Sequence, residues 1–189
     1  MGTTETTADP ATLTGDYAFD AAHSKFGFVA RHAMVTKVRG HFNEFEGSAH
    51  LDFTDASKST VSVSIKAASI DTGHPDRDAH LRSNDFFAMD EFPEITFKST
   101  SIAEAGADDV YSVTGDLTIR GATKSITFEA ERTGPVVDPW GNTRVGFEGS
   151  AVVNRKDWGV NWNMALEAGG VVVSEKVTLE FDVSLTKSS

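Results

Sequence analysis

Apolar and polar residues alternate with a period of two along most of the chain. The clearest alternation covers residues 60–70, 111–119 and 145–153, where nearly every second position is apolar. This pattern is typical of a β-strand that buries one face and exposes the other. With the shorter runs included, we expect strands at residues 15–19, 25–31, 38–53, 60–70, 94–103, 111–119, 125–132, 145–153 and 177–185.

The longest of these runs, residues 38–53, contains one break in its alternation. Phe42 and Phe45 are three positions apart, so a regular strand would place them on opposite faces. We therefore expect a β-bulge near Asn43 and Glu44, which would restore the alternation and bend the strand.

Residues 71–93 lack this alternation. Thr72 is a suitable N-cap residue and Pro75 favours the first helical turn, so we expect a short helix at residues 75–82. The loop that follows carries more large aromatic residues than a solvent-exposed loop needs. We expect these residues to plug or line one end of the core: Phe86, Phe87 and Phe92.

The order of the elements predicts an all-β fold. Strands follow one another through hairpin-length turns, and no strand–helix–strand repeat points to a parallel sheet. We therefore predict an eight-stranded antiparallel up-and-down barrel with one short inserted helix, formed by residues 15–187. Residues 1–14 are rich in threonine and are predicted to form a flexible N-terminal tail.

The predicted inner face of the barrel mixes large and small residues. Gly40, Gly47, Gly115 and Gly149 share it with phenylalanine and valine side chains. Such small residues could leave an elongated apolar channel, or they could only relieve crowding where strands bend. The alternation by itself leaves a hollow barrel and a filled barrel equally open.

Composition excludes several partners and locations. The formal net charge is −11, which disfavours nucleic acid because phosphate binding requires a basic surface. No apolar run approaches the roughly 18 residues of a membrane span. The first residues lack the basic start and apolar segment of a secretory signal, so we expect a cytoplasmic protein. The absence of cysteine excludes disulfides and cysteine-based catalysis.

No motif of a common catalytic class is present. The chain lacks GxSxG, HExxH, a P-loop and GxGxxG. His23, His32, His41 and His50 are nine residues apart, an odd spacing that moves them between the two faces of a continuous strand. We therefore predict no metal site and no catalytic residue.

Basic residues gather at three places that could bind an anion. They lie beside the first corner, on the predicted helix and after the strand at 145–153: Arg31, Lys37, Arg39, Arg77, Arg82, Arg155 and Lys156. If several of them met at one mouth of the barrel, they would form a site for a phosphate or another anionic head group. The alternative is that they form salt bridges with the many acidic residues.

Four segments of the chain resemble the YceI family of lipocalin-like, polyisoprenoid-binding proteins. The segments are HSKFGFVARHAMVTKVRGHF, RDAHLRSNDFFAMDEFPEITFKS, GDLTIRGATKSITF and NRKDWGVNW. They occur in the order of the family, and the resemblance covers nearly all of residues 15–185. Four long matches of this kind are far more specific than a short motif.

The resemblance implies a lipocalin-like barrel with an apolar tunnel for a long isoprenoid chain. The ligand would be of the polyprenyl phosphate or isoprenoid quinone type, bound for storage or transport without any cofactor, and the resemblance also implies a homodimer. Many relatives carry a secretory signal, whereas we expect none for this chain. Two alternatives stay open: an isomerase or cyclase that acts on such a lipid, and a stress-related structural protein with a filled core.

The alternation also selects the residues that would line the tunnel, and Trp158 lies in one of the matching segments. We predict a lining that includes Phe28, Phe42, Leu51, Ile65, Phe97, Leu117, Phe128, Phe147, Phe181 and Trp158. Polar and basic residues within the matching segments are the candidates for contact with the lipid head group. These candidates are Arg31, His32, Arg39, Arg82, Asn154 and Arg155.

Overall fold

The computed structural model describes residues 9–164 and 172–188. Within these residues, one antiparallel sheet accounts for every named strand. The strands are β1 (Gly15–Phe19), β2 (Lys25–His32), β3 (Thr36–Phe42), β4 (Phe45–Leu51), β5 (Thr60–Lys66), β6 (Ile70–Asp71), β7 (Glu94–Glu104), β8 (Val110–Ile119), β9 (Ala122–Val137), β10 (Thr143–Asn154) and β11 (Lys176–Lys187).

The sheet closes into a barrel with eight positions. Three positions are composite strands, each made of two short strands in line: β1 with β2, β3 with β4, and β5 with β6. Neighbours around the barrel are consecutive along the chain, and β11 pairs with both β1 and β2. The predicted eight-stranded up-and-down barrel is therefore confirmed.

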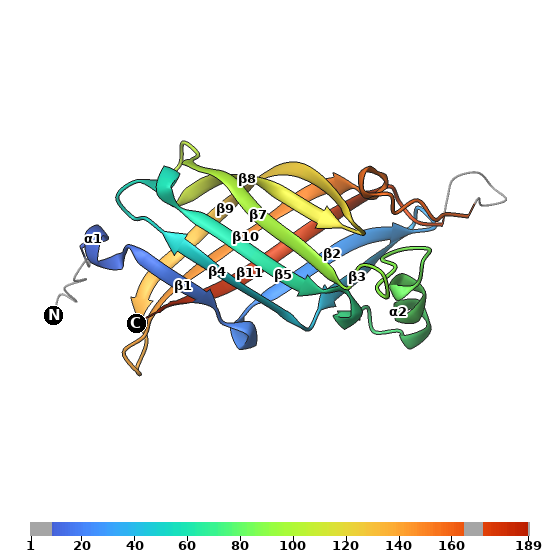
Figure 1. The fold of residues 1–189 in the computed structure, drawn as a ribbon, viewed down its shortest axis with the longest axis horizontal. Coiled ribbons are helices and arrows are strands. Elements are labelled where there is room, and N and C mark those ends of the chain that lie inside the picture. Colours follow the sequence, from blue (N-terminus) through green and yellow to red (C-terminus); the bar gives the residue numbers. More distant parts are fainter. Residues whose placement is uncertain (1–8, 165–171, 189) are drawn as a thin grey trace.

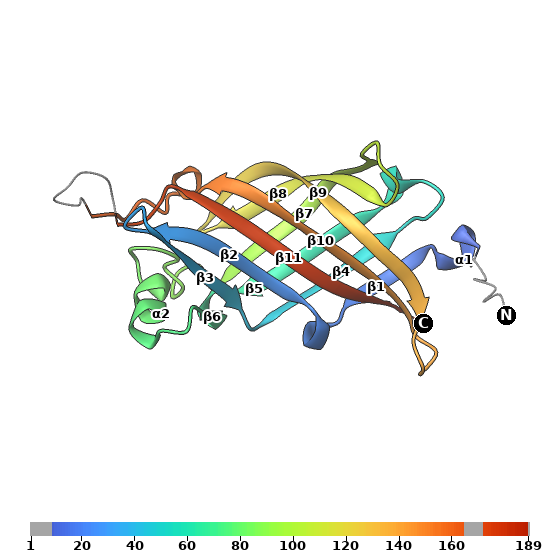
Figure 2. The ribbon, with the colours of Figure 1, turned by 180° about the vertical axis from the view of Figure 1, so that it is seen from behind.

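The barrel has two distinct ends, which Figures 1 and 2 show from opposite sides. At one end, here called the helical end, lie α2 (Pro75–Arg82) and the β2–β3 hairpin. At the other end, here called the terminal end, lie α1 (Pro10–Leu13), the C-terminus of β11 and the turn between β9 and β10. The terminal end also carries the β7–β8 turn, since antiparallel strands bring alternate turns to the same end.

The interruptions in the composite strands are short and specific. η1 (Ala21–His23) separates β1 from β2, and η3 (Ala67–Ser69) separates β5 from β6. A further 3₁₀ helix, η2 (Ala56–Lys58), lies in the connection from β4 to β5. Between β3 and β4 the chain leaves the strand for Asn43 and Glu44, where the bulge was predicted. Asn43 N–H donates to Ser69 O at 3.0 Å, so the backbone stays paired across this break.

The helix α2 begins and ends where the sequence predicts, but its N-cap is His74 and not Thr72. His74 Nδ1 accepts from Arg77 N–H at 3.3 Å. Thr72 instead uses its backbone N–H and its hydroxyl to donate to Asp78 Oδ1, at 2.9 and 2.5 Å. These bonds satisfy the buried Asp78 carboxylate and hold the start of the helix against the end of β6.

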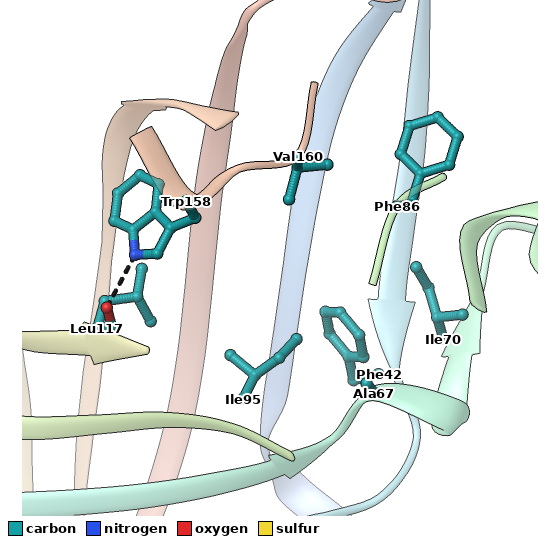
Figure 3. Packing of buried hydrophobic residues seen from close by; sticks show 8 residues of the cluster. All are labelled: Phe42, Ala67, Ile70, Phe86, Ile95, Leu117, Trp158 and Val160. Carbon is teal, nitrogen blue, oxygen red and sulfur yellow. Dashed lines mark hydrogen bonds between the residues drawn. The ribbon is translucent and has the colours of Figure 1, made fainter. Parts of the chain in front are cut away.

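A cluster of buried apolar residues from distant parts of the chain packs at the helical end (Figure 3). Trp158, in the 3₁₀ helix η4 (Arg155–Trp158), is only 3% exposed. Its indole N–H donates to Leu117 O at 2.8 Å, which satisfies the one polar group that its burial would otherwise leave unpaired. The cluster contains Phe42, Ala67, Ile70, Phe86, Ile95, Leu117, Trp158 and Val160.

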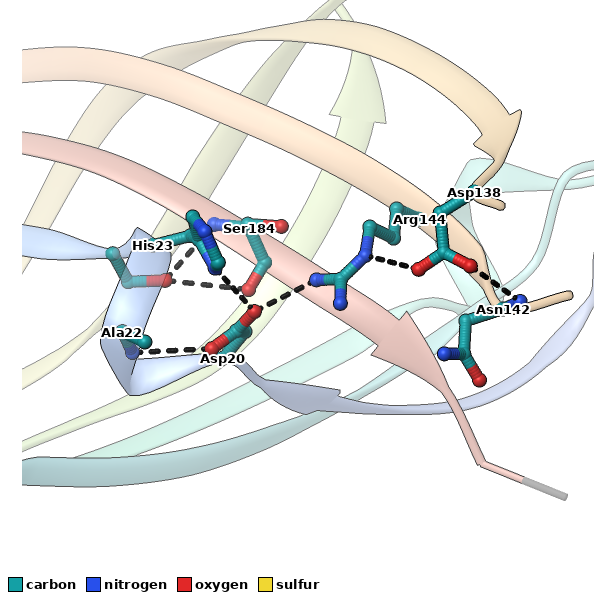
Figure 4. Close-up of polar contacts among 8 residues, drawn as sticks. Asp20, Ala22, His23, Asp138, Asn142, Arg144 and Ser184 are labelled. Atoms are coloured by element: carbon teal, nitrogen blue, oxygen red, sulfur yellow. Dashed lines mark hydrogen bonds and ion pairs between the residues drawn. The ribbon is translucent and has the colours of Figure 1, made fainter. Parts of the chain in front are cut away.

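A polar network bridges the junction between β1 and β2 (Figure 4). Arg144 Nη1 lies 2.7 Å from Asp20 Oδ2, and Arg144 Nε lies 2.7 Å from Asp138 Oδ2. Where the backbone leaves the ladder, Ser24 Oγ accepts from Ser184 N–H at 2.9 Å and donates to Ser184 O at 3.2 Å. The serine side chain thus continues the pairing with β11 across the interruption.

No helix among residues 9–164 and 172–188 has the length and apolar character needed to cross a bilayer. The helix α1 lies within residues 1–14, the range predicted to be a flexible tail, and residues 1–8 lie outside the described residues.

Candidate functional site

A cavity of about 310 Å³ runs through the barrel. Its lining reaches from Phe86 and Trp158 at the helical end to Phe53, Tyr111 and Arg132 at the terminal end. An internal void needs only about 10–15 Å³ on this scale to hold one water molecule, and pockets for small ligands start near 300 Å³. The cavity is therefore large enough for a slim ligand.

The degree to which the inward-facing side chains are buried shows whether the barrel is hollow or filled. Seven of the ten predicted lining residues are only half-buried although they point into the barrel. In a filled core such residues would be buried completely, because interiors pack at the density of organic crystals. The half-buried ones are Phe28, Leu51, Ile65, Phe97, Phe128, Phe147 and Phe181.

Glycines on the inner face explain how the phenylalanine rings leave the lumen open. Gly40 is the cross-strand partner of Phe28, and a Cβ at Gly40 would lie 2.7 Å from Phe28 Cε1. Gly149 is paired with Phe181 in the same way, and a Cβ there would lie 2.7 Å from Phe181 Cζ. Each ring lies over a neighbouring glycine and so lies along the barrel wall, which leaves the centre free.

All ten residues predicted to line the tunnel do line the cavity. They come from nine strands and from η4, so the alternation identified the correct face of each of these strands. The ten are Phe28, Phe42, Leu51, Ile65, Phe97, Leu117, Phe128, Phe147, Phe181 and Trp158. Their contact with a ligand stays a prediction.

The candidates in the β2–β3 hairpin lie outside the cavity lining. Arg31 and His32 are exposed, and Arg31 Nη1 donates to Val35 O at 3.4 Å within the hairpin. Arg39 lies on the outer face of β3, where its guanidinium is 3.6 Å from the Glu180 carboxylate. The structure therefore does not bring these three residues to the tunnel.

Two further candidates hold the backbone at the helical end. Arg82 donates from Nε to Ala68 O at 2.9 Å and from Nη2 to Ile70 O at 3.2 Å, which ties α2 to η3 and β6. Asn154 is the N-cap of η4, and its side-chain oxygen accepts from Lys156 N–H at 3.0 Å. Neither residue lines the cavity.

Arg155 is the one candidate for the head group that lines the cavity. It is buried, and burial lowers the pKa of its guanidinium. Its three side-chain nitrogens all donate to backbone carbonyls: Nε to Ser174 O at 2.9 Å, Nη1 to Val160 O at 2.7 Å and Nη2 to Val173 O at 3.3 Å. This pattern joins η4 to the segment before β11.

Arg132 lines the cavity but was not among the candidates from the sequence. It lies on β9 with the same parity as Phe128 and Ala130, so the alternation was the signal that could have identified it. Its guanidinium carbon lies 5.2 Å from the ring centroid of Phe53 and 5.7 Å from that of Tyr111. Burial raises the pKa of the Tyr111 hydroxyl.

The polar contacts of Arg132 are incomplete. Arg132 Nη2 lies 2.6 Å from Asp109 Oδ1, in the turn between β7 and β8. Arg132 Nε is buried, and no described residue accepts a hydrogen bond from it. An inward-facing guanidinium with one buried, unpaired donor thus lies at the terminal end of the cavity.

Other ionisable groups in the lining are few. They are Asp52, Tyr111 and Arg155, since the carboxylate of Glu180, which also borders the cavity, pairs with Arg39 on the outer face. No histidine from the described ranges reaches the cavity. Asp52 belongs to a turn, where bonds from the Thr54 hydroxyl and from nearby backbone N–H groups lower the pKa of its carboxyl. Over the same ranges, no group of three His, Asp or Glu residues is arranged to hold a metal ion.

Comparisons with known proteins agree with this geometry. The family model of the YceI-like domain matches residues 17–185. UPF0312 proteins from Staphylococcus aureus strains MSSA476 and MW2 are each 39% identical over 166 residues, which covers 87% of this chain and 94% of theirs.

Solved structures show the same barrel. BcnA from Burkholderia cenocepacia has a TM-score of 0.78 at 25% identity and covers 88% of this chain and 98% of its own. The YceI protein of Campylobacter jejuni has a TM-score of 0.73 at 26% identity and covers 84% and 90%. A polyisoprenoid binding domain from Saccharophagus degradans has a TM-score of 0.67 at 16% identity, covers 91% and 98%, and so shares the fold.

Proposed function

The chain belongs to the YceI-like domain family, and on this premise we propose that its barrel binds a long-chain isoprenoid lipid for storage or transport. The observation that carries the proposal is the apolar cavity of about 310 Å³ along the barrel. The description of the Saccharophagus degradans domain as polyisoprenoid-binding supports the same ligand class.

The energetics of burial favour a hydrocarbon chain in this cavity. Each methylene group transferred from water into an apolar site contributes about 0.8 kcal/mol. A chain with many such groups therefore binds tightly without any specific polar contact. The head group, of polyprenyl phosphate or isoprenoid quinone type, would then set the orientation and a modest selectivity.

The composition of the lining supports binding over catalysis. A general acid or base must lie within hydrogen-bond reach of the reacting atoms and have a suitable pKa. Each side-chain nitrogen of Arg155 donates a hydrogen bond to a backbone carbonyl. The Asp52 carboxylate accepts a hydrogen bond from Asp55 N–H within its own turn. The proposal of a cytoplasmic location and that of a homodimer rest on the sequence alone.

Native mass spectrometry of the purified protein, followed by organic extraction, tests the proposal. We expect a mass above that of the polypeptide and an extracted lipid with an isoprenoid chain. Addition of an isoprenoid lipid to extracted protein should restore the higher mass. A clean polypeptide mass that no isoprenoid alcohol, phosphate or quinone shifts would refute the function.

A further inference from the structure

We propose that the head of the ligand lies at the terminal end of the tunnel, where Arg132 Nε donates a hydrogen bond to an uncharged oxygen such as a carbonyl or hydroxyl. The inference rests on the proposed function and assigns an orientation and a head-group class to the same cavity. It differs from the expectation from sequence, which placed the head group near residues 31–39, 82 and 154–155.

The position of Arg132 supports this orientation. Its side chain continues the inward-facing row of β9 after Phe128 and Ala130, so it faces the same lumen as the apolar residues. Because it sits at the end of that row, a chain that fills the apolar part of the cavity would bring its polar end to the guanidinium.

The hydrogen bonding of Arg132 points to a missing acceptor. Buried polar groups in folded proteins are nearly always paired, and an arginine Nε–H can only donate. Arg132 Nε is buried and has no acceptor among residues 9–164 and 172–188. The rings of Phe53 and Tyr111 and the ion pair with Asp109 hold the guanidinium in place, so a ligand oxygen would meet a donor that is already oriented.

The charge around Arg132 favours an uncharged head group. Its positive charge is already paired with the Asp109 carboxylate at 2.6 Å. Burial is the main cause that raises the pKa of the neighbouring Tyr111 hydroxyl; Arg132 lowers that pKa, and the carboxylates of Asp109 and Glu104, which also lie near, raise it. A phosphate at Arg132 would therefore be repelled by these carboxylates, in a chain whose net charge is −11. A carbonyl or hydroxyl carries no net charge and would not be repelled in this way.

The opposite end of the cavity suits the hydrocarbon tail. There the lining is the buried cluster of Phe42, Phe86, Leu117, Trp158 and Val160. Its one guanidinium, that of Arg155, already donates to three backbone carbonyls. The two arginines in the lining thus differ in their pairing: every side-chain nitrogen of Arg155 has a hydrogen-bond acceptor, whereas Arg132 Nε is buried and has none among the described residues.

Binding of matched probes to delipidated protein tests the proposal. The probes are geranylgeraniol, geranylgeranyl phosphate and the corresponding hydrocarbon without oxygen, each measured by displacement of a fluorescent apolar dye. We expect all three to bind the wild-type protein, with the alcohol tightest. Failure of every probe, the hydrocarbon included, would contradict the proposed function and with it this inference.

Substitution of Arg132 isolates the hydrogen bond. Arg132→Met should lower the affinity for the alcohol by about threefold to tenfold, as expected for the loss of one net hydrogen bond. It should leave the affinity for the hydrocarbon unchanged. Arg39→Met is the matched control, because it removes the same charge from the outer face of β3. It should leave the affinities for all three probes unchanged.

Asp109→Asn tests the charge argument with Arg132 in place. Loss of the carboxylate should tighten binding of the phosphate more than that of the alcohol, and added salt should reduce this gain. If Arg132→Met lowers the affinity for the hydrocarbon as much as the affinity for the alcohol, Arg132 has only a structural role. Tighter binding of the phosphate than of the alcohol by the wild type would overturn the assignment of an uncharged head.

Discussion

At the scale of single residues, the arginines of this chain divide by what their nitrogens contact. Arg144 joins two carboxylates, that of Asp138 in the adjacent turn and that of Asp20, which is distant in the sequence. The Arg144 guanidinium beside Asp138 lowers the pKa of that carboxyl to about 2, and the pKa of Asp20 is also lowered. The network therefore holds the β1–β2 junction to the turn between β9 and β10.

The lowered pKa of Asp138 predicts how stability depends on pH. An unfolded aspartate titrates near pH 3.9, so the ionised carboxylate stabilises the fold above about pH 4. This contribution is lost as the pH falls from about 4 towards 2. Arg144→Met should lower the free energy of unfolding at pH 7, and its difference from wild type should shrink over that range.

Urea unfolding at pH 7, 4 and 2.5 measures this effect. Arg39→Met serves as the control, because an exposed ion pair contributes less than about 1 kcal/mol and the side chain of Arg39 is 64% exposed. A difference between Arg144→Met and wild type that stays constant down to pH 2.5 would show that the carboxylates are not the cause.

At this scale, the face of the strand on which a residue lies was easier to predict from the sequence than its hydrogen-bond partners. Parity placed Phe28 on the inner face from the sequence alone, and the same parity holds for Arg132, which was not singled out. It could not tell that Arg155 would donate to three carbonyls while Arg132 would keep an unpaired nitrogen. Those contacts depend on how η4, the segment before β11 and the β7–β8 turn meet in space, which local alternation does not encode.

At the scale of elements, pairs of glycine and phenylalanine on neighbouring strands keep the barrel hollow. The pair Phe28 and Gly40 joins β2 to β3, and the pair Phe181 and Gly149 joins β11 to β10. The glycines are not needed for an unusual backbone angle, because neither has a positive φ. They are needed for the space that their missing Cβ leaves to the ring.

Gly40→Ala should therefore narrow the tunnel. The new Cβ would lie 2.7 Å from Phe28 Cε1 and 2.9 Å from Thr72 Cγ2, so the ring has to swing into the lumen. We expect a loss of about 1–3 kcal/mol in stability, as for other overpacked interiors, together with a lower lipid content per protein. Chemical denaturation and quantitative extraction measure the two effects.

A matched glycine and a second substitution sharpen this test. Gly146→Ala on β10 meets nothing closer than 3.7 Å, so it should change neither quantity. Phe28→Leu in the Gly40→Ala background should restore part of the lipid content, because the smaller side chain vacates the lumen. Unchanged lipid content in Gly40→Ala would mean that the ring position does not limit the tunnel.

The elements themselves were largely predictable, and their exceptions have physical causes. Helix α2 and the break at Asn43–Glu44 follow directly from proline placement and from the shift in alternation. The N-cap was wrong because Thr72 bonds to Asp78, a contact that the sequence gives no reason to prefer over capping. The alternation also left open whether the barrel is filled, since inner residue types do not reveal where their rings lie.

At the scale of the whole molecule, the cavity makes stability depend on the ligand. A hollow interior forgoes the dispersion contacts that a filled core would make. A ligand that binds only the folded barrel restores such contacts and stabilises it by mass action. The empty barrel should therefore be measurably less stable than the loaded one.

Removal and restoration of the lipid tests this dependence. At a free ligand concentration of 100 times its Kd, the stabilisation amounts to about 2.7 kcal/mol. For a domain of this size we expect the midpoint of thermal unfolding to rise by about 5–10 °C on reloading. Equal midpoints for stripped and reloaded protein, compared by scanning calorimetry, would contradict a ligand in the core.

The pairing of β11 with β1 and β2 has a consequence for folding during synthesis. The wall of the tunnel is completed only when the strand made last meets the strands made first. Until β11 has emerged from the ribosome, the nascent chain has an open sheet and no enclosed lumen. An enclosed lumen therefore forms only after β11 has been synthesised and has paired, and until then the exposed inner face needs protection from aggregation.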